Sequence, residues 1–461
     1  MKRNNTTQLS IVTIVIILAL FASCKKLVEV DPPRNQLITS IVFKDSSDAT
    51  SAIVGMYATI MQFSTSVNFG SGAITVFTGL AADEIYSNST DVTQQQFYTN
   101  AVSPQNEETT YWWVFAYQLI YQANACIEGL LDNTTLKSEV RNQLLGEAKF
   151  VRAWLYFNLV NLYGDVPLAT SINYHTNSVM ARTTSEQVYN QIINDLADAQ
   201  QLLPGNYITT GRLRPNLYTA TALLSRAYLY FKQWDKAEAE ASKVINSGHY
   251  SLEPNLNDVF KKVSNEILWQ MPPLQTPIGV SETFQFIPFN SSRIPNFSIS
   301  NSLLAAFENG DQRKINWVNS RTIQSQTYFI PFKYKLLISS TSEENYVIFR
   351  FAEQYLIRSE ARTRQNNLTN ALADLNMIRS RAGLTTFASN SQDDILSAIL
   401  QERRVELFCE TGHRWYDLKR TGTINSVLGL VKPGWQTTDA LFPIPMNELQ
   451  VNPFLVQNPG Y

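Results

Sequence analysis

Residues 401–420, with the sequence QERRVELFCETGHRWYDLKR, combine charged and aromatic side chains more densely than any other stretch of the chain. Glu402, Glu406 and Glu410 recur at every fourth position, so on a helix they would share one face. Carboxylates that leave water must be paired, and the guanidinium group of arginine fits them well. The stretch therefore predicts a partly buried ion-pair clasp that holds the terminal helix to its neighbours. Its expected members are Glu402, Arg403, Glu406, Arg414, Trp415, Asp417 and Arg420.

An alternative interpretation of the same stretch is a catalytic site, because glutamates, arginines, His413 and Asp417 all occur within it. A catalytic site needs further groups, such as a nucleophile, a metal-ligand set or a phosphate-binding loop. None of these lies nearby in the sequence, so the structural interpretation is favoured. It carries the expectation that Glu406→Ala impairs folding more than ligand binding.

The overall composition limits the classes of partner. The chain has 461 residues, and 37 Lys and Arg against 39 Asp and Glu give a net charge of −2. Nucleic-acid binding depends on a basic surface, so this balance argues against nucleic acid as the main partner. Only 16% of the residues are charged while 11% are aromatic. Such a composition fits a protein that acts outside the cytoplasm and contacts uncharged polar ligands.

The amino terminus is similar to a bacterial lipoprotein signal. A short basic region is followed by an apolar run that ends directly before Cys24. The run is shorter than a helix needs to span the apolar core of a bilayer. We expect residues 1–23 to be removed as a signal peptide and the sulfur of Cys24 to carry lipid, with residues 24–35 as a polar tether. The alternative is a signal-anchor helix followed by an incidental cysteine.

Residues 216–246 contain the clearest repeat in the chain. Ser225 and Ala237 lie at the spacing where tetratricopeptide repeats place small residues, which lets two antiparallel helices approach closely. Ser359 and Ala371 keep the same separation later in the chain. One such unit cannot bury its own apolar face, so the helix pairs are expected to stack into a single curved layer. The predicted fold class is mainly α, with tetratricopeptide-like helix pairs.

Two stretches interrupt the helical pattern, residues 64–110 and residues 252–341. Both are rich in polar residues or proline, yet both keep aromatic side chains, which loops normally lose. Aromatic rings among hydrogen-bonding groups suit sugar-like ligands, so the two stretches are expected to form a loop-rich ligand face with small hairpins. The candidate ligand-binding residues are Asp83, Tyr86, Asn88, Trp317, Asn319, Arg321 and Tyr328. For each aromatic residue, packing within the core is the alternative.

Several boundaries follow from the same patterns. The chain divides into an amino-terminal helical part, residues 36–250, and a carboxy-terminal part, residues 251–461, which begins with the second interrupting stretch. Alternation from residue 328 to residue 336 predicts a hairpin strand. Ser185 is expected to cap the helix that follows it. The proline-broken ending is expected to wrap back across the core.

The sequence predicts no cofactor, metal or catalytic site. The three histidines lack the spacing of metal ligands, and no GxSxG motif, phosphate loop or dinucleotide fingerprint is present. Adjacent acidic pairs do not by themselves supply the two separated carboxylates that a glycosidase needs. Cys126 and Cys409 both fall in helical patterns, and the sequence leaves their pairing open.

Several stretches together resemble the SusD/RagB family of Bacteroidetes outer-membrane lipoproteins. They are the lipidated cysteine with its tether, the helix ending YGDVP, the repeat LLSRAYLYFKQWDKA, the block ERRVELFCETGHRWYDLKR and the ending NPFLVQNPGY. The resemblance implies a mostly helical, non-catalytic protein that is anchored to the outer membrane through Cys24 and faces the medium. It also implies that the protein forms a lid over a SusC-like TonB-dependent transporter and captures oligosaccharides or other nutrient fragments for it. One departure is Lys25-Lys26, because surface-directed members often have acidic residues after the cysteine.

Two other functions stay as alternatives. Tetratricopeptide layers often bind peptides in a concave groove, so one alternative is an interaction scaffold. The other is a glycan-active hydrolase, for which the sequence offers no defined site.

Overall fold

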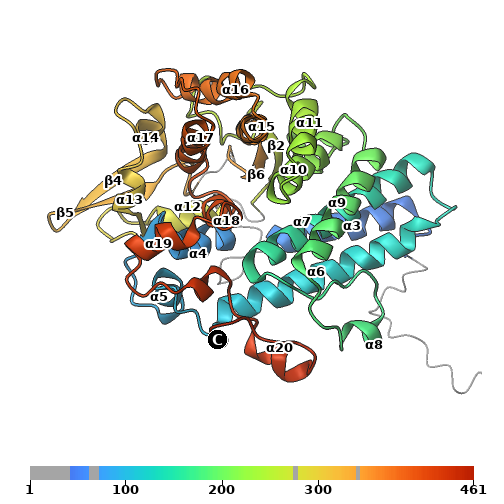
Figure 1. The fold of residues 1–461 in the computed structure, drawn as a ribbon. Helices are drawn as coiled ribbons and strands as arrows, with labels where there is room; N and C mark the ends of the chain where they lie inside the picture. The colour runs from blue at the N-terminus through green and yellow to red at the C-terminus, as the bar shows by residue number, and fades with distance from the viewer. Residues whose placement is uncertain (1–41, 62–71, 274–278, 339–342) are drawn as a thin grey trace, which may run out of the picture.

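The computed structural model describes residues 42–61, 72–273, 279–338 and 343–461 (Figure 1). Helices form most of this part of the chain and the strands are short, so the predicted mainly α fold is confirmed. The predicted signal peptide, Cys24 and the tether lie outside the described residues. No described helix is both long enough and apolar enough to cross a membrane.

The helices α3 (Ser46–Met61), α6 (Glu107–Leu131), α7 (Ser138–Tyr163), the short α8 (Tyr174–Asn177) and α9 (Ser185–Leu202) precede the repeats. The helix α7 is central to the core, because every residue from Gln143 to Tyr163 except Lys149 is buried. It packs against α6 and α9, as a helix that is apolar on most of its faces requires. Gly164 ends α7 with a φ of 75°, which glycine adopts without strain.

The repeats consist of α10 (Leu217–Tyr230) with α11 (Trp234–Ile245) and α15 (Phe351–Arg364) with α16 (Leu368–Arg381), followed by α17 (Gln392–Glu406). Ser225 and Ala237 are completely buried, and the Ser359 hydroxyl donates to the Ala371 carbonyl at 2.7 Å. The small residues therefore lie at close helix contacts, as predicted. The helix α11 packs against α15, although residues 246–350 separate them. Figure 1 shows the resulting arc of helices, from α16 at the top to α6 at the lower right.

Three two-stranded antiparallel sheets occur in the described residues. They are β1 (Ile85–Ser87) with β3 (Phe297–Ile299), β2 (Ile267–Met271) with β6 (Tyr346–Arg350), and β4 (Val318–Ile323) with β5 (Gln326–Pro331). The strands β2 and β6 are fully buried, whereas β4 and β5 form a hairpin at the left edge of the molecule (Figure 1). The predicted hairpin strand therefore exists as β5, but it ends at Pro331 and not at residue 336.

The first interrupting stretch is more helical than predicted. It contains α4 (Ile74–Ala81), whose eight residues are all buried, and α5 (Val92–Tyr98). Within α4 the Thr78 hydroxyl donates to the Ile74 carbonyl one turn earlier, so a polar side chain fits inside the core. Threonine and glycine are weak helix formers, and the tertiary packing decides the conformation of this segment. Residues 62–71 of the stretch lie outside the described part.

The remaining short helices are α12 (Ser281–Phe286), α13 (Asn301–Leu304), α14 (Gln312–Trp317), α18 (His413–Arg420), α19 (Ile424–Val431) and α20 (Met446–Val451), with 3₁₀ turns η3 (Thr210–Arg212) and η4 (Thr437–Ala440). One helix start differs from the prediction: Thr184, and not Ser185, caps α9 by accepting from the amide of Gln187. The ending does cross back over the core, since the Asn458 amide donates to the carbonyls of Tyr163 and Phe442.

Candidate functional site

Glu406 is the centre of a buried ion-pair network. Its carboxylate lies 2.6 Å from Arg350 Nη1 and 3.0 Å from Arg313 Nη1, and it also pairs with Arg381. The carboxylate and its three partners are almost completely removed from solvent. Burial acts to raise the pKa of Glu406, but the three guanidinium groups outweigh burial and hold that pKa well below its usual value. Glu406 therefore stays charged inside the core.

The partners of Glu406 come from three elements that are far apart in the sequence. Arg313 lies in α14, Arg350 ends β6 and Arg381 ends α16. Arg313 also pairs with Glu402 at 2.5 Å, so two of the acidic residues on one face of α17 share one cation. The spacing in residues 401–420 reveals the acidic side of this network and none of the three arginines.

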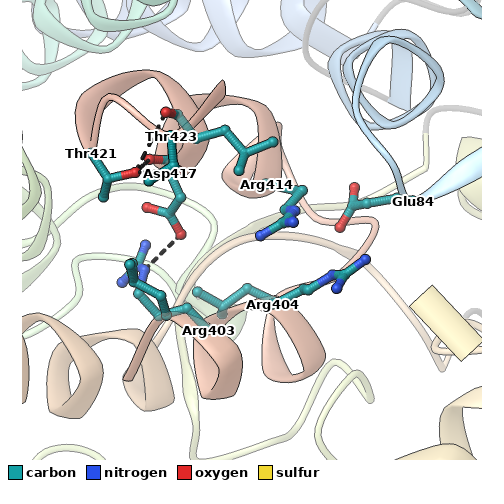
Figure 2. A pocket seen from close by; sticks show the side chains of 10 residues that line it. Glu84, Arg403, Arg404, Arg414, Asp417, Thr421 and Thr423 are labelled. Carbon is teal, nitrogen blue, oxygen red and sulfur yellow. Dashed lines mark hydrogen bonds and ion pairs between the residues drawn. The ribbon is translucent and has the colours of Figure 1, made fainter. Parts of the chain in front are cut away.

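Arg403, Asp417 and Arg420 connect α17, α18 and α15. Arg403 Nε donates to Asp417 Oδ2 at 2.7 Å, which Figure 2 draws as a dashed line. Arg420 Nε donates to the other oxygen of Asp417 at 2.7 Å and its Nη1 holds Glu360 of α15 at 2.6 Å. These contacts attach α18 both to the helix before it and to the second repeat.

Arg414 and Trp415 attach α18 to other parts of the core. Trp415 is completely buried and stacks on Phe442 with a centroid separation of 5.2 Å. Arg414 Nε donates to Asp83 Oδ1 at 2.7 Å, and Arg404 Nη2 lies 2.6 Å from Asp83 Oδ2. Burial acts to raise the pKa of Asp83, but the two arginines outweigh it and lower that pKa. The structure thus places the Asp83 carboxylate in ion pairs of the clasp, and Asp83 as a ligand group stays a prediction.

Figure 2 shows a cavity among these charged groups, bordered by Glu84, Arg403, Arg404, Arg414 and Asp417. Its volume is about 20 Å³, which is room for about one water molecule. A sugar ring cannot enter a space of this size. The geometry of residues 401–420 therefore supports a structural role for the clasp.

A larger cavity opens where the two interrupting stretches meet. The strand β1 pairs with β3, with Ile85 opposite Ile299, and β3 packs against β5 of the hairpin. These contacts bring three segments around a cavity of about 560 Å³. Its lining includes Tyr86, Tyr98, Asn301, Thr327, Phe329 and Lys432. We call this space the hairpin cavity.

The lining of the hairpin cavity mixes aromatic rings with hydrogen-bonding groups. Tyr98 and Phe329 are each 36% exposed, and Tyr86 is partly exposed. Asn301 and Thr327 add an amide and a hydroxyl. Apolar surface with a few polar groups is typical of sites for small neutral ligands. The cavity is suited to bind a ring that has both an apolar face and hydroxyl groups.

Lys432 fixes one edge of the hairpin cavity. Its Nζ donates to the carbonyls of Leu80 at 2.7 Å and Tyr98 at 2.8 Å, and it lies 4.2 Å from the centroid of the Tyr98 ring. Burial lowers the pKa of Lys432 to about 7. The lysine therefore acts as an anchor for α19 and the end of α5, next to the aromatic lining.

Two of the predicted ligand residues, Asp83 and Tyr86, line the hairpin cavity. Asn88 instead joins the two stretches, because its Nδ2 donates to the Pro295 carbonyl at 2.9 Å and to Ser298 Oγ at 2.8 Å. This amide is used to hold β1 against β3. The structure therefore places Asn88 beside the ligand face as a connecting residue.

The predicted ligand residues of the β4–β5 hairpin lie on the face of the hairpin that is turned away from Phe329. Arg321 is opposite Tyr328, and Asn319 is opposite Ile330. Opposed residues of antiparallel strands share a face, and neighbours along a strand alternate. Asn319, Arg321 and Tyr328 therefore share the face away from Phe329, which lines the cavity.

The structure places Trp317 in the core, which was the alternative considered for each aromatic residue. It is completely buried, and its Nε1 donates to the Leu256 carbonyl at 2.9 Å. The ring packs near Phe260 and Phe408. A ligand cannot reach it without unfolding this part of the core.

A neighbouring cavity of about 510 Å³ contains acidic groups, among them Asp91, Glu107 and Glu108. Burial, with the charges of Asp91 and Glu107, raises the pKa of Glu108 to about 7. Asp91 already caps α5 by accepting from the amide of Gln94 at 2.9 Å. These carboxylates are the candidates that the hydrolase alternative would need. In the described residues, these carboxylates included, no group of three or more His, Cys, Asp and Glu side chains is arranged to hold a metal.

Glu282, in the first turn of α12, predicts a pH dependence of stability. It is buried, and burial raises its pKa to about 8 from the reference value of 4.5. Because the folded pKa is the higher one, the bound proton stabilises the fold at low pH, and this contribution is lost as pH rises from 4.5 to about 8. Glu282→Gln is therefore expected to raise Tm by a few degrees near about pH 9 and to change it little near about pH 5.

Differential scanning fluorimetry of the Glu282→Gln variant at the two pH values checks this expectation. Glu139→Gln, at an exposed position of α7, serves as the matched control and is expected to leave Tm unchanged at both. An equal shift of Tm by Glu282→Gln at both pH values would contradict the assignment.

Comparison with known proteins matches both halves of the chain to one family. Residues 43–229 match the SusD-like family described as starch-binding associating with outer membrane, and residues 305–461 match the SusD family. SusD-like protein P25 of Formosa agariphila is 25% identical, over 98% of this chain and 99% of that protein. SusD-like protein P2 of the same organism is 27% identical, over 98% of this chain and 99% of its own length.

Solved structures show that the fold is shared as well. A SusD superfamily protein from Bacteroides vulgatus superposes with a TM-score of 0.80 and 20% identity, covering 91% of this chain and all of its own. A laminarin-binding SusD-like protein superposes with a TM-score of 0.75 and 24% identity, covering 90% of this chain and 99% of its own. The family matches cover residues 43–229 and 305–461, and the relatives align over almost their full length. The chain therefore belongs to the SusD/RagB family.

Proposed function

We propose that this protein binds an oligosaccharide or another nutrient fragment in the hairpin cavity and delivers it, uncleaved, to a SusC-like TonB-dependent transporter. The observation that carries the proposal is the cavity itself. It brings partly exposed rings from both interrupting stretches, Tyr86, Tyr98 and Phe329, together with hydrogen-bonding side chains in a space of about 560 Å³. The laminarin-binding neighbour supports carbohydrate as the ligand class.

We also propose that the protein is held at the outer membrane by lipid on Cys24 and faces the medium. The family description, associating with outer membrane, supports this location. Mass spectrometry of the native protein for a diacylglyceryl group on Cys24, with protease accessibility of intact cells, tests both parts. The division of the chain into residues 36–250 and 251–461 stays a prediction.

Calorimetric titration with laminarin fragments and a panel of other polysaccharide fragments tests ligand binding. Phe329→Ala and Tyr86→Ala are each expected to lower the affinity about tenfold, because each removes a ring that a sugar can cover. Tyr328→Ala is the matched control, since its side chain lies on the opposite face of the same hairpin. Absence of binding to every fragment, or an equal loss in the control, would contradict the proposed site.

Two further measurements separate the proposal from its alternatives. Purification of the native lipoprotein in gentle detergent is expected to retain a TonB-dependent barrel. A protein that purifies alone under these conditions would favour an independent binder or a scaffold. Release of reducing ends from glycans, abolished by Glu108→Gln, would instead establish the hydrolase alternative.

A further inference from the structure

A further cavity lies between α6, α8 and α20. Its volume is about 360 Å³, and its lining shares no residue with that of the hairpin cavity. Figure 1 shows α8 and α20 below α6 at the lower edge of the molecule. The residues that matter for its chemistry are Trp113, Tyr117, Tyr121, Tyr174, Asn177 and Glu448. We call it the α8 cavity.

The inner wall of the α8 cavity is aromatic and fixed. Trp113 and Tyr117 are neighbours on α6, with ring centroids 5.0 Å apart, and the Tyr117 hydroxyl donates to the Pro167 carbonyl at 2.8 Å. Asn124 is tied to the next segment as well, because its Nδ2 donates to the Ala169 carbonyl at 3.0 Å. The wall is therefore formed in the absence of a ligand, which lowers the cost of binding.

Two aromatic rings stand exposed at the α8 cavity. Tyr121 of α6 is 52% exposed and Tyr174 of α8 is 74% exposed. Both line the cavity and have much of their surface in water. An apolar ring face that covered either tyrosine would remove this surface from water, which is favourable by the hydrophobic effect.

Two polar side chains of the α8 cavity, Asn177 and Glu448, carry oxygens that accept hydrogen bonds. Asn177 Nδ2 donates to the Ser171 carbonyl at 2.7 Å, whereas its Oδ1 is buried and finds no hydrogen-bond donor in the described residues. A buried acceptor without a donor is unfavourable, and a ligand hydroxyl would supply the donor. Glu448 adds a half-buried carboxylate, which accepts a hydrogen bond from the Trp113 indole and whose pKa burial raises. A suitable ligand therefore offers several hydroxyl donors and carries no negative charge.

We propose that the α8 cavity is a second carbohydrate site, which takes one neutral pyranose ring. The ring lies with its C–H face on Tyr121 or Tyr174, and its hydroxyls donate to Asn177 Oδ1 and to the Glu448 carboxylate. The inference rests on the proposed function for the class of ligand, and it adds a separate place where the same glycan chain is held. Two sites on one molecule raise the affinity for a long chain beyond that of either site when the chain spans both.

Ligand-observed NMR with the methyl glycosides of glucose, galactose and mannose tests the site with single-ring probes. In a Phe329→Ala background, which weakens the hairpin cavity, saturation transfer to a methyl glycoside is expected to persist. Adding Tyr121→Ala is expected to lower the remaining affinity at least about fivefold, and Asn177→Ala to do the same. Phe454→Ala is the matched control, because this ring is exposed near α20 and does not line the cavity.

The possible results separate the two sites. Loss of all binding in Phe329→Ala alone would overturn the second site and leave the proposed function standing. An affinity of Phe329→Ala that is unchanged by adding Tyr121→Ala and Asn177→Ala would overturn it too. N-acetyltryptophan amide serves as a probe for an aromatic peptide side chain. If it binds and Tyr121→Ala weakens its binding, while Tyr121→Ala weakens the binding of no methyl glycoside, the cavity takes a peptide side chain and the proposal is wrong. Near-ultraviolet circular dichroism of each variant confirms that it is folded.

Discussion

Glu406→Ala is expected to lower the free energy of unfolding by about 3–5 kcal/mol. The substitution removes the carboxylate that pairs with Arg350, Arg381 and Arg313, all of which are almost completely buried. The three guanidinium groups would then repel one another in the protein interior, where water cannot solvate them and fewer carboxylates balance their charge. Urea unfolding followed by tryptophan fluorescence measures the loss as a lower transition midpoint.

Asp258→Ala is the matched control for Glu406→Ala. Asp258 pairs with Lys261 at 2.8 Å, but both side chains are well exposed, so removing the pair is expected to leave the midpoint unchanged. The affinity of folded Glu406→Ala for a glycan fragment is expected to equal that of the wild type. A variant that unfolds at the wild-type urea concentration and yet loses binding would show that Glu406 acts in the ligand site.

Asp83→Ala is expected to be the second most damaging substitution, with a loss of about 3 kcal/mol. Its carboxylate is 2% exposed and is shared by Arg404 and Arg414, which have little contact with solvent. Removal leaves both guanidinium groups without their anion. It also loosens the attachment of β1 to α18, so the hairpin cavity is expected to be less well ordered. Thermal and urea unfolding measure the first effect.

A double-mutant cycle distinguishes this structural role from ligand contact. Arg414→Ala in the Asp83→Ala background is expected to cost less than Arg414→Ala alone, because the orphaned charge disappears with the arginine. Strict additivity of the two losses would show that Asp83 and Arg414 do not stabilise the fold through each other. The pair would then have to be reconsidered as ligand groups.

Local periodicity explains the part of the fold that the sequence predicts. The separation of Ser225 from Ala237, and of Ser359 from Ala371, is set by the geometry of two adjacent helices, so it can be recognised without knowing the rest of the chain. The four-residue spacing of the glutamates in α17 is local in the same sense. Features of this kind depend on contacts within one helix or one helix pair.

Features that depend on contacts between distant parts of the chain cannot be predicted from local sequence patterns. No spacing connects Glu406 to Arg313, Arg350 or Arg381, because the network joins α17 to three other elements that are distant in the sequence. The buried helix α4 is hidden for a related reason: its threonines and glycine indicate a loop, and only its packing on all sides makes it helical.

The hairpin cavity lies between the two stretches that the sequence predicts as the ligand face, but only some of the predicted residues line it. Alternation in the hairpin predicts that one face of β5 differs from the other, but it does not say which face meets β3. The prediction chose Tyr328, whereas Phe329 lines the cavity. Trp317 shows the same ambiguity, since an aromatic residue in a polar stretch can equally face a ligand or fill the core.

The packing of α11 on α15 has a consequence for the order in which the chain folds. The first repeat has to wait for residues 246–350 to be made before its neighbour in the layer exists. Closing so long a loop costs conformational entropy before any contact repays it, and chains dominated by such contacts fold slowly. The clasp comes later still, because its glutamates lie beyond residue 401. We therefore expect the newly made chain to complete its helical layer only after most of it has been synthesised.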